Sequence, residues 1–410
     1  MATYKQHKHT YRWLTNAFHT VYSNIALLLT VTTVVILDSF KSWAKKLDIG
    51  YRNFLGTDTS SFWIVDSVIH VTLNLPPTMH DVYVADITKC YESIPLTGQD
   101  NLLEALQFMI RTGFQEAARL HTKAETILWV KFAQDNTPMT ARWGTTQPKS
   151  GRWIPMSQTR LISLHSWLMN NCFVALGDRV WRQTRGIPMG FSCSPLWCNI
   201  YLMTYEVKFI QRLASMGRKD LLNKFRYAFR YIDDICWVNV GNPQDFLSPE
   251  QPRTPDNPFW IYPLHILEIK TEVSKFGATD PTQGISAHFM NVQFDLHETD
   301  PKNFVMRKYD KRRNLPFKYT QFIKFQSNRP VRQSYNIIIS QILPILYISN
   351  DTMIAFQEIL LLIRTLESNG FQAHRLQNLV TRWLETGTFP STKTNIQALT
   401  LLLKHTAQTQ

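Results

Sequence analysis

The chain has 410 residues, 44% of them hydrophobic, and a formal net charge of +13 at pH 7. This length and apolar content place it among ordinary globular proteins with room for two or three sub-domains. The positive charge favours polyanionic partners, because Lys and Arg side chains neutralise phosphates and release counterions.

The number of cysteines and the hydropathy of the chain predict the cellular compartment of the protein. The five cysteines are odd in number and scattered, with neither the spacing of a zinc site nor a disulfide framework, which predicts a reducing, intracellular environment. The most apolar run, 25–37, is shorter than the roughly 20 residues that a membrane-spanning helix needs, so we expect a buried helix and no membrane partner. The basic opening does not have the pattern of a secretory signal.

The first part of the chain mixes helical and strand-like patterns. A long apolar segment predicts one helix over 20–47, and a strand-like alternation over 82–86 ends at an acid, Asp86. A second helix is expected over 101–124. The tryptophan-containing stretch 125–156 has no clear period and predicts an irregular or hairpin insertion.

The middle of the chain carries turn signals. Helical periodicity over 158–171 is followed by a glycine-aspartate turn that predicts a hairpin over 172–182. The glycine-rich elbow GIPMG at 186–190 precedes a long helix expected over 194–216. These patterns predict that the elbow connects a hairpin to a helix.

An acidic pair interrupts the next apolar segment. We expect a hairpin over 225–240 with Asp233 and Asp234 within it. The segment 241–256 is rich in Pro, Asn and Gln and predicts a loop, whereas 289–296 has the composition of a strand.

The last part of the chain is basic and then helical. Residues 302–332 contain ten Lys or Arg residues interleaved with aromatic ones, a mixture that contacts phosphates and stacks on bases. The pattern is helical from there on. One helix is expected to begin at Asp351 and end at Asn369–Gly370, and Thr392 or Thr394 can cap the last helix.

The acids carry the expected chemistry. Asp86 and the Asp233-Asp234 pair stand among β-forming residues, where an unpaired buried carboxylate is costly, so a cation must compensate. Hard cations take oxygen ligands, and two Mg²⁺ ions can bridge a triphosphate and a primer. We therefore expect Asp86, Asp233 and Asp234 to be catalytic and to bind two Mg²⁺ ions, with Ile87 as a further ligand and Mn²⁺ as a substitute ion.

Three segments resemble a known family. The segment YIDDICWV at 231–238 resembles the Tyr-x-Asp-Asp signature of reverse transcriptases, and VADITKCYESIPL at 84–96 resembles their motif A. The elbow at 186–195 resembles motif B in the Pro-Met-Gly form that is usual in Penelope-like retroelements, and telomerase catalytic subunits share these motifs. The resemblance implies an RNA-directed DNA polymerase of the Penelope-like or telomerase-related group, with an α+β right-hand polymerase fold.

The same resemblance implies a division into fingers, palm and thumb. The expected order is fingers at 1–80, palm with motif A at 81–96, a fingers or palm insertion at 97–185, palm with motifs B to E at 186–300, and a helical thumb at 301–410.

Nucleotide selection is expected from motifs A and B. Tyr91 stands where reverse transcriptases keep an aromatic ring against the sugar, and that ring would exclude a 2′-hydroxyl by steric clash. Met189 and Gly190 are expected to contact the nucleotide, although many reverse transcriptases have Gln where Met189 stands. Glu92 stands where relatives commonly have Asp or Asn.

Basic residues are expected at the triphosphate. The opening resembles the Lys-x-His-Lys…Arg-Pro-Ile stretch of Penelope-like fingers, which implies that Lys8 and Arg12 clamp the triphosphate. Trp13 replaces the usual Pro. Lys270 lies where motif D is expected and would donate a proton to the leaving pyrophosphate.

Template and primer contacts follow from the same motifs. The expected residues are Gly186, Pro188, Ser192, Tyr231, Phe289, Asn291, Lys308, Lys311 and Arg312. Ser327, Tyr335 and Gln341 follow the Ser…Tyr…Gln order of a Penelope-like thumb.

Other classes remain open at this level. They are a non-copying nucleic-acid-binding relative, a template-independent terminal transferase, a prokaryotic-type reverse transcriptase and a viral RNA polymerase; the lack of Gly before Asp-Asp disfavours the last. The expected partners are an RNA template, a DNA or RNA primer and dNTPs, with a longer parent protein or a separate nuclease to supply cleavage. The resemblance also implies nuclear residence.

Overall fold

The chain forms two compact units, each assembled from segments that are separate in sequence. The computed structural model describes residues 2–5, 10–13, 20–120, 126–132, 138–176, 178–241, 243–247, 260–263, 267–275, 286–297, 300–310, 321–328, 330–389 and 392–408. Unit 1 comprises Met1–Ile64, Asp86–Asp233 and Asn242–Lys270, and unit 2 comprises Val65–Ala85, Asp234–Gly241 and Thr271–Gln410. Helices and strands both contribute, so the prediction of a mixed helix-and-sheet fold is confirmed.

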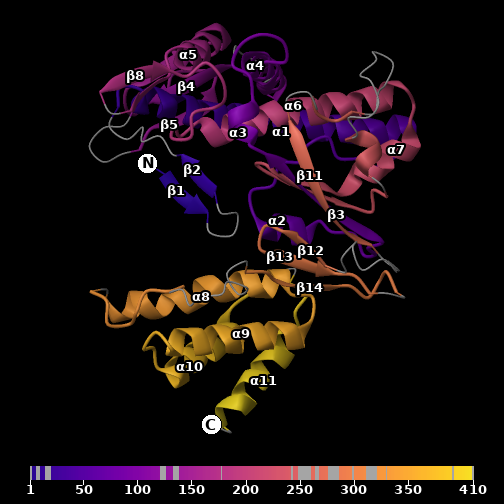
Figure 1. Cartoon of the computed structure of the whole chain (residues 1–410), viewed down its shortest axis with the longest axis vertical. Coiled ribbons are helices and arrows are strands. Elements are labelled where there is room, and N and C mark those ends of the chain that lie inside the picture. The colour runs from indigo at the N-terminus through magenta and orange to yellow at the C-terminus, as the bar shows by residue number, and fades with distance from the viewer. Residues whose placement is uncertain are drawn as a thin grey trace. The chain divides into compact units, whose positions relative to one another are not determined.

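Helices form much of both units (Figure 1). Those of unit 1 are α1 (Ser23–Leu55), α3 (Cys90–Ser93), α4 (Leu102–Leu120), α5 (Gln158–Asn170), α6 (Ser194–Ser215) and α7 (Lys219–Lys224), with 3-10 turns at Phe225–Tyr227 and Pro243–Phe246. Those of unit 2 are α2 (Val68–Leu73), α8 (Val331–Ile348), α9 (Thr352–Glu367), α10 (Ala373–Thr386) and α11 (Ile396–Gln408).

The strands form small antiparallel sheets and one larger sheet. The four-stranded sheet has the order β11 (Glu268–Lys275), β3 (Asp81–Thr88), β10 (Asp234–Val238), β9 (Ala228–Tyr231). The other sheets pair β1 (Ala2–Lys5) with β2 (Thr10–Trp13), β7 (Phe173–Leu176) with β8 (Arg179–Arg182), β4 (Ile127–Lys131) with β5 (Thr140–Gly144) and β6 (Trp153–Met156), and β13 (Val292–Asp295) with β12 (Ser286–Phe289) and β14 (Val305–Lys308).

The core of unit 1 is built on α1. Its buried face includes Leu29, Ile36 and Phe40 at helical spacing, and it packs against α4, α5 and α6. Gly113 of α4 permits close approach, because a Cβ there would lie 2.5 Å from the Cγ2 atom of Ile36. The helix is longer than the predicted 20–47 and, among the described residues, is long and apolar enough to cross a membrane by length and composition alone; 44% of its most apolar stretch is buried in protein.

The insertion after α4 is more regular than expected. Residues 127–156 contain a three-stranded sheet in which β4 lies between β5 and β6. Trp143 of β5 donates a hydrogen bond from Nε1 to Ser39 Oγ of α1 at 2.9 Å and packs edge-on against Phe114 of α4. The sequence shows no strand period here because burial along β4 does not alternate: Leu128, Trp129 and Val130 are all buried.

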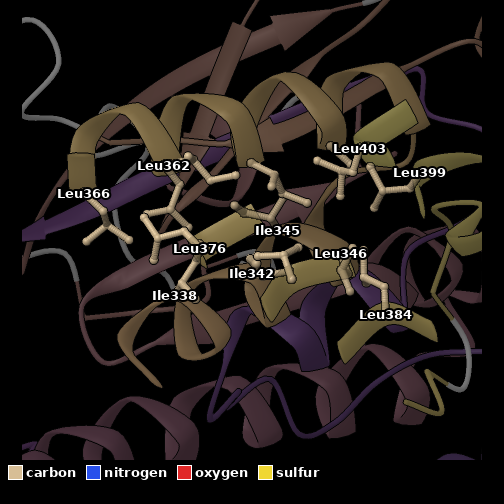
Figure 2. Close-up of a cluster of buried hydrophobic side chains, with 14 of the residues drawn as sticks. Ile338, Ile342, Ile345, Leu346, Leu362, Leu366, Leu376, Leu384, Leu399 and Leu403 are labelled. Atoms are coloured by element: carbon tan, nitrogen blue, oxygen red, sulfur yellow. The ribbon is translucent and has the colours of Figure 1, made fainter. Parts of the chain in front are cut away.

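The helices at the C-terminal end of unit 2 share one aliphatic core (Figure 2). Side chains from α8, α9, α10 and α11 meet there, among them Ile342, Leu362, Leu376 and Leu403. Asp351 caps α9 by accepting a hydrogen bond from the Ile354 N–H, as predicted. The bundle therefore forms from local caps and from apolar faces that are buried together.

Two predictions for unit 2 are wrong in detail. The single strand expected at 289–296 is the hairpin of β12 and β13, which turns at Met290 with φ 54° and Asn291. No glycine marks this turn, so the apolar run concealed it. The last helix is capped by Asn395, which accepts from the Ala398 N–H, whereas the Thr394 hydroxyl donates to the carbonyls of Leu346 and Ser349. Residues 242 and 248–256 of the predicted loop lie outside the described residues.

Candidate active site

The acidic pair lies at a strained turn between two strands. β9 ends at Tyr231 and β10 begins at Asp234, and Ile232 between them has φ 58°. A β-branched residue rarely adopts this left-handed conformation, which costs of the order of 1–3 kcal/mol and persists only where the surroundings impose it. The turn is therefore held by contacts beyond its own sequence.

The buried side chain of Arg230 makes those contacts with the turn. Its guanidinium donates to the carbonyl of Ile232 at 2.9 Å and to Oδ1 of Asn199 at 2.7 Å, and it forms an ion pair with Glu206 through two nitrogens. Arg230 and Glu206 are both fully buried. Since a buried charge is tolerated only when it is paired and hydrogen-bonded, this network fixes both side chains in one arrangement.

A tyrosine completes the network. The Tyr262 hydroxyl donates to Glu206 Oε1 at 2.7 Å. Burial raises the pKa of Tyr262, and the negative charge of Glu206 raises it further. Burial opposes the charge of Arg230, yet the pKa of Arg230 is raised because Glu206 stabilises the guanidinium. We therefore assign a neutral Tyr262 beside a charged Arg230–Glu206 pair.

The strand that carries Asp86 reaches the acidic turn. The N–H of Ile87 donates to the carbonyl of Asp233 at 3.0 Å. This bond sets the position of Asp86 beside that of Asp233, and both side chains are partly exposed. Asp234 follows as the first residue of β10 and is also partly exposed.

The predicted sugar-contacting residue lies against the glycine elbow. The Ile187 N–H donates to the carbonyl of Tyr91 at 2.6 Å, and the Gly186 N–H donates to the carbonyl of Ile94 at 3.1 Å. Gly186 has φ 79°, and a Cβ there would lie 2.9 Å from both the Glu92 Cα and the Tyr91 carbonyl oxygen. Only glycine fits this approach, so the segment that carries Tyr91 and the glycine elbow are joined through backbone atoms.

The rest of the elbow is also fixed locally. The Ser194 hydroxyl donates to the carbonyl of Pro188, and the Gly190 N–H donates to the same carbonyl at 3.0 Å. Ser192 accepts from the Thr30 hydroxyl at 2.9 Å, and Met189 is partly exposed. These bonds make the elbow a single rigid connection into α6.

Two cysteines lie beneath the same region. The Sγ atoms of Cys90 and Cys198 are 3.2 Å apart, and both residues are buried. The pKa of Cys198 is raised well above its usual value by its hydrogen bond with Cys90 and by burial. The Cys198 thiol is therefore protonated near neutral pH.

The remaining predicted nucleotide contacts are only partly described. Lys8 lies outside the described residues, and Arg12 lies in β2 opposite Thr3. Lys270 lies in β11, where its side chain is exposed and its Nζ is 3.5 Å from Glu268 Oε1. Hydrogen bonds thus join the segments around Asp86, the glycine elbow and Asp233, whereas Lys270 pairs with an acid of its own strand.

The predicted template and primer residues fall in different environments. Tyr231, at the acidic turn, is 36% exposed. Phe289 of β12 is fully buried, so its ring packs inside the protein. Asn291 is exposed at the β12–β13 turn, and its carbonyl accepts from the Tyr309 N–H at 2.7 Å. Lys308 donates from Nζ to Gln341 Oε1 at 3.2 Å, and Lys311 and Arg312 lie outside the described residues.

Three supporting residues were missed in the sequence. Arg230, Glu206 and Tyr262 lie on both sides of the acidic pair along the chain, but nothing in their spacing links them. Arg230 itself could have indicated the network, because an arginine within a buried apolar strand needs an acidic or hydrogen-bonding partner. No group of three or more His, Cys, Asp or Glu side chains within the described ranges is arranged to hold a metal ion.

Comparison with known proteins gives structural neighbours only. No protein-family model and no curated protein matches the chain. Similar solved structures include telomerase from Candida albicans in complex with the TWJ fragment of telomeric RNA, at 11% identity and TM-score 0.47, covering 94% of this chain and 55% of that one. Another is apo telomerase from Candida tropicalis truncated from its C-terminal domain, at 15% identity and TM-score 0.37, covering 71% of this chain and 46% of that one. The chain spans about half the length of each.

Proposed function

We propose that this protein is a reverse transcriptase, an RNA-directed DNA polymerase that extends a primer with dNTPs, of the Penelope-like or telomerase-related group. The observation that carries the proposal is the backbone hydrogen bond from Ile87 to Asp233, which brings Asp86 of β3 to the acidic turn. The Gly186 elbow against Tyr91 lies in the same unit and supports it. Nucleotidyl transfer needs these parts: acids for metals, and a rigid wall for the nucleotide.

The chemistry of the donor atoms suits Mg²⁺, and the proposal requires the three carboxylates to converge when the ions bind. Asp86, Asp233 and Asp234 offer carboxylate oxygens on adjacent backbone segments, and hard divalent cations take such ligands; the partly exposed side chains are accessible to ions. When bound, two Mg²⁺ ions would activate the primer 3′-hydroxyl and neutralise charge on the leaving pyrophosphate. The Ile87 carbonyl lies beside these acids in the chain and is a further ligand in the proposal.

The chain's own residues would orient the reactants. Arg230 fixes the carbonyl of Ile232, and so restricts the turn that carries the acids. The backbone of Tyr91 is held through its carbonyl by Ile187, and in the proposal its ring lies against the sugar of the incoming nucleotide. In the right-hand architecture that we propose, the acids belong to the palm and the α8–α11 bundle to the thumb.

Primer extension tests the proposal. The assay supplies a primer on an RNA template, dNTPs and Mg²⁺, and compares the unaltered chain with Asp86→Ala and with a control, Asp220→Ala, whose carboxylate is 61% exposed and pairs with Arg218. We expect full-length product from the unaltered chain and the control, and none from Asp86→Ala.

Two other outcomes would replace the proposal. Addition of nucleotides without a template would indicate a terminal transferase. RNA binding by folded protein without any synthesis would indicate a non-copying nucleic-acid-binding protein.

A further inference from the structure

The β7–β8 hairpin exposes an unusual concentration of apolar surface. Phe173, Val180 and Trp181 are 45%, 69% and 56% exposed, although they lie within nine residues of one another. Isolated exposed apolar side chains are ordinary, whereas several on one short hairpin indicate an interaction surface. These exposed fractions show that other described elements leave much of these side chains in contact with solvent.

Arginines accompany these side chains on both faces. In the antiparallel register Phe173 is opposite Arg182, and Val174 is opposite Trp181. Directly opposed residues share a face, and residues two apart along a strand share it too, so Phe173, Val180 and Arg182 lie on one face and Trp181 and Arg179 on the other. Each face therefore combines an aromatic ring with a guanidinium.

The charge is positive and continues toward the elbow. Residues 172–185 contain three arginines, Arg179, Arg182 and Arg185, and one acid, Asp178. All three arginines are exposed, and within the described residues no ion pair links them to a carboxylate. Guanidinium planes bind phosphates and stack on bases, and aromatic rings stack on bases of any sequence.

The hairpin is anchored on the candidate active site. The Gln183 N–H donates to the carbonyl of Cys172 at 2.9 Å and closes the base of the hairpin. The Gln183 side-chain amide donates to the carbonyls of Arg185 at 3.1 Å and Gly186 at 2.8 Å. The exposed surface is thus attached directly to the elbow that contacts Tyr91.

We propose that the β7–β8 hairpin is a binding site for single-stranded nucleic acid, and that it holds the unpaired template strand next to the elbow. The choice of the template as ligand rests on the proposed function. Single-stranded nucleic acid is the ligand that we choose, because three arginines against one acid complement a chain of phosphates and the exposed rings can stack on bases. Trp181 stacks on a base, and Arg179 and Arg182 neutralise phosphates.

Binding of a fluorescent, unstructured 20-nucleotide RNA by the full chain, measured by anisotropy without dNTPs or divalent metal, tests this site. We expect Trp181→Ala to weaken binding about 5- to 100-fold, the range for removing one base-stacking ring, and Trp181→Phe to retain most of the affinity. Phe54→Ala is the matched control, because Phe54 is 88% exposed on α1 of the same unit. Equal affinities for Trp181→Ala and this control would overturn the proposal.

The salt dependence tests the arginines separately. Changing Arg179 and Arg182 together to Gln should make the slope of log K against log salt shallower by about 0.7 for each phosphate that is no longer neutralised. The exposed Arg119→Gln on α4 should leave the slope unchanged. An unchanged slope in the double variant would also overturn the proposal, as would a dimer of the unaltered chain that Trp181→Ala converts to a monomer with full RNA affinity.

The outcomes separate this site from the proposed function. Primer extension by the unaltered chain, together with unchanged RNA binding in the hairpin variants, would refute the hairpin site alone. Weakened binding in Trp181→Ala, together with no extension by the unaltered chain, would refute the polymerase and leave the hairpin as a nucleic-acid site.

Discussion

The acidic turn in unit 1 and the α8–α11 bundle in unit 2 are stabilised by different kinds of side chain. Beneath the turn, a fully buried Arg230 is satisfied by Glu206, Asn199 and a backbone carbonyl. In the bundle, isoleucines and leucines fill the centre (Figure 2). The hydrogen bonds of Arg230 fix the direction of the Ile232 carbonyl. Aliphatic packing in the bundle contributes stability that depends on how well the side chains fill the buried volume. Substitutions in the two regions should therefore separate geometry from stability.

The largest effect is expected at the turn itself. Asp233→Ala should lower the rate of primer extension by about a thousandfold or more, because it removes a ligand of the metal ions that would neutralise the developing charge. RNA affinity should stay close to that of the unaltered chain, since phosphate contacts are distributed elsewhere. Extension kinetics and anisotropy on the same preparation check this, and a parallel loss of binding would contradict it.

The second largest effect is expected at the buried Arg230–Glu206 pair that holds the turn. Glu206→Ala leaves the Arg230 charge buried without its carboxylate, and we expect the free energy of unfolding to fall by about 3–5 kcal/mol in urea denaturation. Arg230→Met combined with Glu206→Leu should recover much of that stability, because no unpaired charge remains. The double variant should still synthesise poorly, since the carbonyl of Ile232 no longer has its donor.

One outcome of these two variants would contradict the positioning role of the Arg230–Glu206 pair. Full synthesis by the stable double variant would show that the buried pair supports folding only and does not position the turn.

The bundle should respond through stability. Ile342→Ala removes fully buried methyl groups and should destabilise by about 2–5 kcal/mol. Hydrogen exchange of the α8–α11 amides reports the loss in that unit. Leu401→Ala is the matched control, because Leu401 is 67% exposed and its change should cost under about 0.5 kcal/mol. Similar exchange in both variants would mean that the aliphatic cluster does not determine stability there.

The smallest effect concerns sugar selection. Tyr91→Ala removes the ring but keeps the carbonyl that Ile187 binds, so the elbow stays in place. Discrimination between dNTPs and rNTPs should fall by about 10- to 200-fold, the range for a steric contact in a pocket. Competition between the two nucleotides in primer extension measures it, and unchanged selectivity would exclude Tyr91 as the gate.

Regular elements were predictable where local chemistry is strong. The strand ending near Asp86, the hairpin over 172–182 and the helix opening at Asp351 follow from alternation, a turn dipeptide and a cap. The hairpin at 286–295 was missed because Met290 adopts φ 54° without a glycine to signal it. The sheet at 127–156 was missed because its strands lack an alternating apolar pattern and are recognisable only by their pairing with one another.

The sequence by itself determined the positions of the acids, the glycine elbow and the aromatic after motif A, because each depends on residue type and short spacing. Only the tertiary structure decided that Ile87 bonds to Asp233, that Gly186 packs on Tyr91, and that Arg230 supports the turn through Glu206. These contacts join residues 24 to 146 positions apart, and no local rule sets such pairings. They form because buried polar groups must find partners, and the fold decides which partners lie within reach.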